Sequence, residues 1–86
     1  MASPSLDYYY FDSCPFCRMV LNVIQKNKIK VNYCDIFSSQ EHLDKLVADT
    51  GQRMVPCLYI DGKPMHESSD IMQWLESNLD NLEKTG

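Results

Sequence analysis

Residues 6–17 read LDYYYFDSCPFC, and this stretch decides the fold. The aromatic, nearly continuous apolar run over residues 6–11 predicts a strand that is buried on both faces. Over residues 15–27 the apolar side chains recur at helical spacing, and the leading proline suits a first helical turn because its missing N–H would have no partner there. The strand therefore delivers Cys14 to the N-terminus of a helix, and Cys17 lies one turn further in.

The rest of the chain continues an alternation of strands and helices. Gly51 is a good helix stop, and the pair Asp61-Gly62 is a strong hairpin signal. The predicted order is βαβαββα, an α/β arrangement in one domain spanning residues 1–86, with the first few residues and the tail from Asn81 expected to be loose. The further strands are expected at residues 29–36, 57–60 and 63–66, and the further helices at residues 40–49 and 68–79.

Composition limits the classes of function. A formal net charge of −4 with only eight Lys and Arg argues against nucleic acid as a partner. No apolar run approaches the roughly 20 residues that span a bilayer, and the N-terminus does not resemble a signal peptide, so we expect no membrane association. In a chain without an export signal, a C-x-x-C pair indicates redox or metal chemistry in a reducing cytoplasm.

The pair Cys14 and Cys17 carries the chemistry. The thiolate is the reactive form, and the unpaired N–H groups and positive dipole of a helix N-terminus stabilise an anion at Cys14. We expect Cys14 to be the exposed nucleophile. Cys17 is placed to attack a mixed disulfide on Cys14 and resolve it, while Pro15 stiffens the ring between the two sulfurs.

A metal site is the alternative interpretation of this pair. It would be completed by the two remaining cysteines, with His42 and His66 as spare ligands. Metal knuckles usually bring a second close pair of ligands, whereas Cys34 and Cys57 are solitary. We therefore expect no metal, and we expect Cys34 and Cys57 to be small buried hydrophobes.

Two further segments are informative beside the cysteine pair. Val55-Pro56, at a strand entry, is a candidate cis peptide that would leave the Val55 backbone free to pair with a bound peptide. Residues 66–70, His-Glu-Ser-Ser-Asp, open the last helix and are expected first of all to cap it. The same helix start could also hold a ligand carboxylate while Asp70 holds an ammonium group, which would fit a zwitterion.

These features, in this order, resemble the glutaredoxin family of the thioredoxin fold over residues 6–79. The carriers of the resemblance are CPFC at residues 14–17, TGQRMVP at residues 50–56 and GKPMHESSDI at residues 62–71. The resemblance implies a thioredoxin-like fold, a four-stranded mixed sheet with three helices, in which Cys14 attacks and Cys17 resolves. It also implies a glutathione site around Cys14, formed by Phe16, Arg53, Met54, Val55, Pro56, Ser69 and Asp70.

The chain departs from the glutaredoxin pattern at three places. Phe11 stands where that family commonly has a Lys, Phe16 where Tyr is usual and Met54 where Thr is usual. The pair Glu67-Ser68 resembles the N-terminal domain of glutathione transferases, which share the fold and bind the γ-glutamyl group with such a pair.

The function expected from this resemblance is glutathione-dependent thiol-disulfide exchange. Glutathione would be the reducing co-substrate, and disulfide-containing or glutathionylated proteins would be the partners of a monomer. One alternative is a [2Fe–2S] carrier that binds its cluster through Cys14 and glutathione, which Pro15 and Cys17 argue against. The other is a transferase-like N-terminal domain, which we expect less because no helical domain follows Leu79.

Overall fold

The computed structural model describes residues 4–85, so the expectation for the first three residues lies outside the described part. Four strands and three helices follow one another in the order βαβαββα, which confirms the predicted architecture, and one short 3-10 turn is added near the end. The elements are β1 (Leu6–Tyr10), α1 (Pro15–Lys26), β2 (Asn32–Asp35), α2 (Gln40–Thr50), β3 (Cys57–Ile60), β4 (Lys63–Met65), α3 (Ser68–Ser77) and η1 (Leu79–Asn81).

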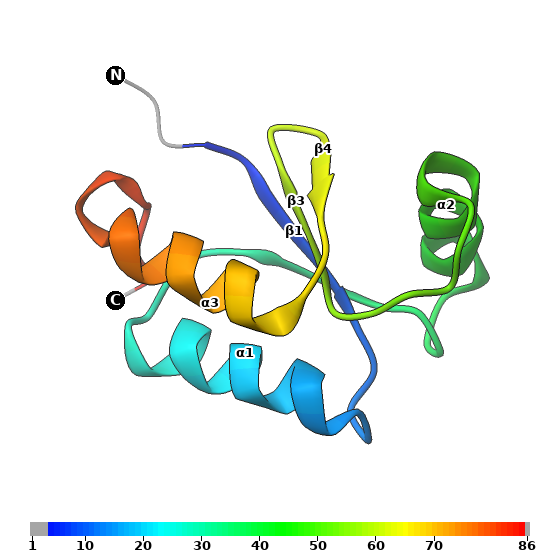
Figure 1. Ribbon diagram of the computed structural model, residues 1–86, viewed down its shortest axis with the longest axis horizontal. Helices are drawn as coiled ribbons and strands as arrows, with labels where there is room; N and C mark the ends of the chain where they lie inside the picture. Colours follow the sequence, from blue (N-terminus) through cyan, green and yellow to red (C-terminus); the bar gives the residue numbers. More distant parts are fainter. Residues whose placement is uncertain (1–3, 86) are drawn as a thin grey trace.

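The sheet has the strand order β2-β1-β3-β4, with β1 near its centre. β1 runs parallel to β2 and antiparallel to β3, so Tyr9 is paired with Cys34 on one side and with Cys57 on the other. Helices α1 and α3 pack together on one face of the sheet, and α2 covers the other (Figure 1). Because both faces are covered, the aromatic run of β1 is buried on both sides, as its sequence predicts.

The two faces of the sheet form two cores. Tyr8 and Tyr9 are adjacent in β1 and point to opposite faces, so each core receives one of them. The core under α1 and α3 contains Leu6, Tyr8, Val20, Ile24, Ile29, Leu58, Ile71, Leu75 and Leu82. The core under α2 contains Tyr9, Cys34, Ile36, Leu46, Cys57 and Tyr59.

The second strand is shorter than the predicted span of residues 29–36, because the chain before it pairs elsewhere. Lys28 has a left-handed φ of 54°, which turns the backbone out of α1. The Lys30 N–H then donates to the Glu83 carbonyl at 2.8 Å, and the Thr85 N–H donates to the Lys28 carbonyl at 2.8 Å. Residues 28–30 are therefore held by the C-terminal segment rather than by β1.

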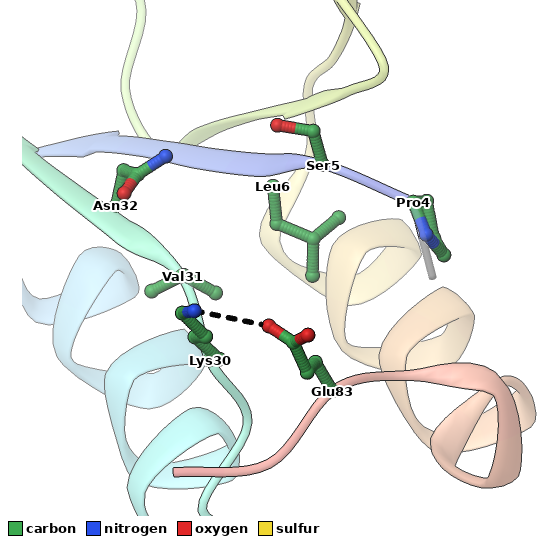
Figure 2. A pocket seen from close by; sticks show the side chains of 7 residues that line it. All are labelled: Pro4, Ser5, Leu6, Lys30, Val31, Asn32 and Glu83. Atoms are coloured by element: carbon green, nitrogen blue, oxygen red, sulfur yellow. Dashed lines mark ion pairs between the residues drawn. The ribbon is translucent and has the colours of Figure 1, made fainter. Parts of the chain in front are cut away.

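This pairing also corrects the expectation of a loose tail from Asn81. Leu82 is buried in the core under α1 and α3, and the Lys30 ammonium lies 3.1 Å from the Glu83 carboxylate. Figure 2 shows this ion pair beside the start of β1. Both charged side chains are well exposed, so the burial of Leu82 and the backbone hydrogen bonds hold the segment more than the ion pair does.

The helix ends follow local backbone chemistry. α2 ends at Gly51, whose φ of 76° is left-handed and whose N–H donates to the Val47 carbonyl at 2.7 Å, so the predicted stop is confirmed. α3 ends two residues before the predicted Leu79, because the Asn78 N–H donates to the Leu75 carbonyl three residues back and tightens the chain into η1. Within residues 4–85, every helix is too short and too polar to cross a bilayer.

Candidate functional site

Cys14 is the N-cap of α1. Its N–H donates to the Phe11 carbonyl at 3.2 Å, which closes the turn after β1, and its backbone is extended at φ −80° and ψ 117°. The Sγ accepts the Cys17 N–H at 3.4 Å, as a serine or aspartate oxygen does at most helix starts. The first turn of α1 carries no acidic residue. The Cys14 sulfur thus lies against an N–H donor at the positive end of the α1 dipole.

The structure corrects the expectation that Cys14 is exposed, because this residue is only 7% exposed. Its Sγ is turned back over the end of α1 to accept the Cys17 N–H, and that direction takes it away from solvent. Phe16, between the two cysteines, is 59% exposed instead. The Cys14 sulfur thus lies just below the surface, close in the chain to a projecting aromatic ring.

Cys17 is fully buried one turn into the helix. Burial first, and the contact with Cys14 second, raise the pKa of the Cys17 thiol to about 12. The Tyr8 hydroxyl donates to the Cys17 carbonyl at 2.8 Å and fixes this turn of α1 against the sheet. Cys17 is consequently held as a neutral thiol beside the Cys14 sulfur.

The other two cysteines lie on the opposite face of the sheet, in the core under α2. Burial raises the pKa of Cys57 to about 11 and raises the pKa of Cys34 as well. Their interpretation as buried hydrophobes is confirmed. Within residues 4–85, no three His, Cys, Asp or Glu side chains gather where a metal ion could be held.

The Val55-Pro56 peptide is cis, as predicted. Pro56 is buried and Val55 is half-buried at the entry to β3. Among the described residues, the Val55 backbone N–H and carbonyl make no hydrogen bond to another part of the chain. An open pocket of about 150 Å³ lies here, and its lining comes from the start of α1, the cis-proline loop and the start of α3: Phe16, Met54, Val55, Pro56, Glu67 and Ser68.

The start of α3 corrects the expectation that its polar side chains serve as caps. Glu67 stands at the N-cap with a left-handed φ of 70°, and no side chain caps the helix there. A left-handed φ is costly for a residue other than glycine and is found preferentially at functional sites. The first N–H groups of α3 and the Glu67 carboxylate therefore remain available at the pocket.

The pocket joins some of the predicted glutathione residues and leaves others outside. Phe16, Met54, Val55 and Pro56 line it together, whereas the exposed side chains of Arg53, Ser69 and Asp70 lie outside its lining. From the start of α3, the pocket is lined by Glu67 and Ser68, which the sequence-based set did not include. Their likeness to the transferase pair was the available signal.

Tyr8 is also absent from the site residues that the sequence predicts. Its hydroxyl reaches the Cys17 carbonyl across nine residues of chain, and a contact between a strand and a helix has no local sequence signature. In the sequence Tyr8 is simply one of three consecutive tyrosines in a buried strand.

Comparison with known proteins gives the family. The family described as the N-terminal domain of glutathione S-transferase matches residues 9–82. The chain belongs to this family. The pair Glu67-Ser68 and its place in the pocket agree with that membership.

This family member is also similar to glutaredoxins, which confirms the resemblance seen in the sequence. The chloroplastic glutaredoxin-C4 of rice, Oryza sativa subsp. japonica, is 37% identical over 62 residues, which make up 69% of this chain and 47% of the rice protein. The chain thus spans about half the length of the curated relative it matches.

Solved structures show that the fold is thioredoxin-like. Wheat glutaredoxin superposes with a TM-score of 0.69 at 22% identity, over 98% of this chain and 87% of the wheat chain. A glutathione transferase homologue from Drosophila mojavensis, solved with bound glutathione, superposes with a TM-score of 0.75 at 19% identity. That match covers 88% of this chain and 36% of the longer transferase chain.

Proposed function

We propose that the chain is a glutathione-dependent thiol-disulfide oxidoreductase in which Cys14 attacks and Cys17 resolves. The observation that carries the proposal is the capping geometry at Cys14, where Sγ accepts the Cys17 N–H at 3.4 Å at the start of a helix without acidic residues in its first turn. The thiolate is the nucleophile in disulfide exchange, and reactive cysteines in general lie at helix N-termini of this kind. Similarity to a rice glutaredoxin supports the same chemistry.

Glutathione is the proposed co-substrate, and the pocket beside Cys14 supplies groups that match it. The free N–H and carbonyl of Val55 can pair with the peptide backbone of glutathione in the manner of an added strand. The uncapped N–H groups at the start of α3 suit a carboxylate. The glutathione bound to the transferase homologue from Drosophila mojavensis supports this assignment.

Ser69, Asp70 and Arg53 stay predictions as glutathione contacts. All three are exposed and close in sequence to pocket residues, so a ligand larger than the pocket could reach them from its rim. Arg53 would then supply a cation, since Phe11 occupies the position where a Lys is expected. Phe11 instead packs against Phe37, with ring centroids 4.8 Å apart.

The proposed reaction on a glutathionylated protein balances with glutathione alone. The Cys14 thiolate attacks the glutathione sulfur, a Cys14–glutathione disulfide forms, and the protein thiolate leaves and takes up a proton. A second glutathione thiolate then attacks the bound glutathione sulfur, releasing glutathione disulfide and restoring the Cys14 thiolate.

Reduction of a protein disulfide requires the second cysteine. Cys14 first forms a mixed disulfide with one sulfur of the target, and the other target sulfur leaves as a thiol. Cys17 then loses its proton and attacks the Cys14 sulfur, which releases the reduced target and forms the Cys14–Cys17 disulfide. Two glutathione molecules reduce that disulfide. We propose that these steps take place in a monomer in the reducing cytoplasm, on glutathionylated or disulfide-containing proteins.

Substitution of each cysteine tests the proposal. Cys14→Ser is expected to abolish turnover of a mixed disulfide between glutathione and a small thiol, because no nucleophile remains. Cys17→Ser is expected to retain that turnover, which needs one thiol, and to lose reduction of a protein disulfide. Steady-state kinetics on both substrates measures the difference.

Cys34→Ser is the matched control, since it replaces another cysteine outside the site and should keep both activities. Its stability must be checked by a thermal melt, because this cysteine is buried. Full activity in Cys14→Ser, or equal loss of both activities in Cys17→Ser, would refute the assignment of roles.

A second candidate function follows from the family match. Transfer of glutathione to an electrophile is favoured by the position of Glu67 and Ser68 in the pocket and by the family to which residues 9–82 belong. Measuring conjugation of glutathione to an aromatic halide separates the two functions. Conjugation that persists in Cys14→Ser would favour the transferase, whereas its absence beside disulfide exchange would favour the oxidoreductase.

A further inference from the structure

A groove lies on the flank of α1 away from Phe16. It has a volume of about 410 Å³ and is lined by Asp12, Arg18, Leu21, Asn22 and Gln25. Leu21 packs against the core below, and the other four are exposed polar or charged side chains. The lining shares no residue with the pocket proposed for glutathione.

The lining residues of the groove come from the face of α1 that follows Cys14 in the sequence and from the loop before it. Arg18, Leu21 and Gln25 follow Cys14 by four, seven and eleven residues, which is the spacing of one helix face. Asp12, two residues before Cys14, closes the groove at the same end. From Arg18 to Gln25 the helix rises about 10 Å, the length of about three extended residues. A polypeptide attached to a sulfur at Cys14 can therefore lie along this row.

Basic residues are concentrated in α1 and just after it, while the lining of the groove itself carries one positive and one negative side chain, Arg18 and Asp12. Residues 18–30 hold four of the eight Lys and Arg of the chain and none of its twelve Asp and Glu. Arg18, Asn22 and Lys26 are exposed at successive turns of α1. Within residues 4–85, neither Arg18 nor Asp12 forms an ion pair, so the charge of Arg18 is available to a partner.

From these observations we infer that this groove is the docking site for the polypeptide part of the substrate, and that it selects segments with acidic residues a few positions away from the target cysteine. The inference rests on the proposed function and names its substrate class. Glutathione would occupy the pocket on one flank of α1, and the protein it is attached to would contact the other. Asp12 would set the direction, since it repels an acidic side chain from the Cys14 end and leaves Arg18 and Lys26 to receive it.

The test compares peptides that differ only in charge. Each peptide carries one glutathionylated cysteine, flanked a few positions away on both sides by Asp and Glu, by Asn and Gln, or by Lys. The protein is expected to turn over the acidic peptide with a kcat/KM about tenfold above that of the lysine peptide. This preference should shrink as the salt concentration rises, because the charges are exposed.

Charge reversal in the groove provides the decisive variant. Arg18→Glu is expected to lower kcat/KM for the acidic peptide about five- to tenfold and to raise it for the lysine peptide, and Arg18→Gln should lie between the two. Lys63→Glu in β4 is the matched control, because it changes the net charge equally at an exposed position outside the groove. It should change the preference by less than about twofold.

A mixed disulfide of glutathione with a small, uncharged thiol separates failure of this inference from failure of the proposed function. The wild-type protein and the variants Arg18→Glu, Arg18→Gln and Lys63→Glu should all turn over this small substrate equally. Wild-type protein that is inactive on this substrate would refute the proposed function, and the inference with it. Activity on it together with equal kcat/KM for the three peptides, or a preference that Lys63→Glu shifts as much as Arg18→Glu, would overturn the inference alone.

Discussion

Cys14 uses sulfur where most helices use oxygen. A capping sulfur satisfies one N–H at the start of α1. The proposed chemistry would use the same contact, because an N–H donor at a helix N-terminus is a setting that stabilises thiolates in general. Its geometry also explains why Cys14 is only 7% exposed, since the sulfur must lie over the helix end to accept the bond.

Alkylation should distinguish Cys14 from the other three cysteines. At pH 7 a small reagent such as iodoacetamide is expected to modify one thiol, because burial raises the pKa of Cys17 to about 12, that of Cys57 to about 11 and that of Cys34 above its usual range. Mass spectrometry of the native protein after timed quenching identifies the modified residue.

The size of the reagent tests the burial of Cys14. A bulky maleimide should react more slowly with the native protein than iodoacetamide does, relative to their rates on the same protein in urea. Modification of Cys34 or Cys57 before Cys14 in the native state would contradict both the burial and the assignment of the nucleophile.

Local sequence was sufficient for some site residues and insufficient for others. The position of Cys14 at a helix start and the cis form of Val55-Pro56 could be anticipated because strand, proline and helix signals lie within a few residues of them. The burial of Cys14 and the hydrogen bond from Tyr8 depend on the direction of side chains across the fold, which residue spacing alone does not give.

The helix α2 shows how one residue can end an element. A Cβ at Gly51 would meet no atom within 4 Å, so space does not require glycine there. The requirement is the left-handed φ of 76°, which lets the N–H reach the Val47 carbonyl at 2.7 Å. Stability at this position therefore depends on the backbone conformation rather than on packing.

Substitution at Gly51 should follow this reasoning. Gly51→Ala is expected to lower the free energy of unfolding by about 1 kcal/mol, since a Cβ disfavours the left-handed region. Gly51→Asn should cost less, because Asn tolerates that region best among the other residues. Urea unfolding of both variants measures the difference, and equal stability of Ala and Asn would rule out a conformational cause.

The bounds of an element could be predicted where neighbouring residues determine them. They could not be predicted where residues far away in the sequence determine them. The bounds of β3 were predicted to the residue, and those of α1 and α2 to within one. β2 begins three residues later than predicted, since Lys28 and Lys30 pair with residues 83–85. Alternating apolar residues indicate a strand, but they do not show which segment of the chain pairs with it.

Burial of ionisable side chains makes the whole fold sensitive to alkali. Two cysteines and three tyrosines keep their protons to higher pH in the folded chain than in the unfolded chain, where they ionise near pH 8.5 and 10. Burial is the first cause in each case. It raises the pKa of Cys17 and Tyr9 to about 12, that of Cys57 to about 11, and those of Tyr8 and Tyr59 further.

The free energy of unfolding is therefore expected to be flat with respect to these groups below about pH 8.5 and to fall above it. The unfolded chain releases protons there that the folded chain retains, so rising pH favours unfolding, and the fall should steepen above about pH 10 as the tyrosines join. Urea unfolding midpoints between pH 7 and 11, with a reductant present, measure the effect. A constant midpoint up to pH 11 would contradict it.

The C-terminal segment returns both ends of the described chain to one side of the molecule. β1 leads from Ser5 to the loop before Cys14, α1 runs back from it, and Thr85 is bonded to Lys28 beyond the far end of α1 (Figure 1). Any fusion, dye or surface linkage joined to either end of the described chain would depart from the side remote from Cys14. The domain can thus be tethered at these ends, alone or within a longer polypeptide, without covering the start of α1.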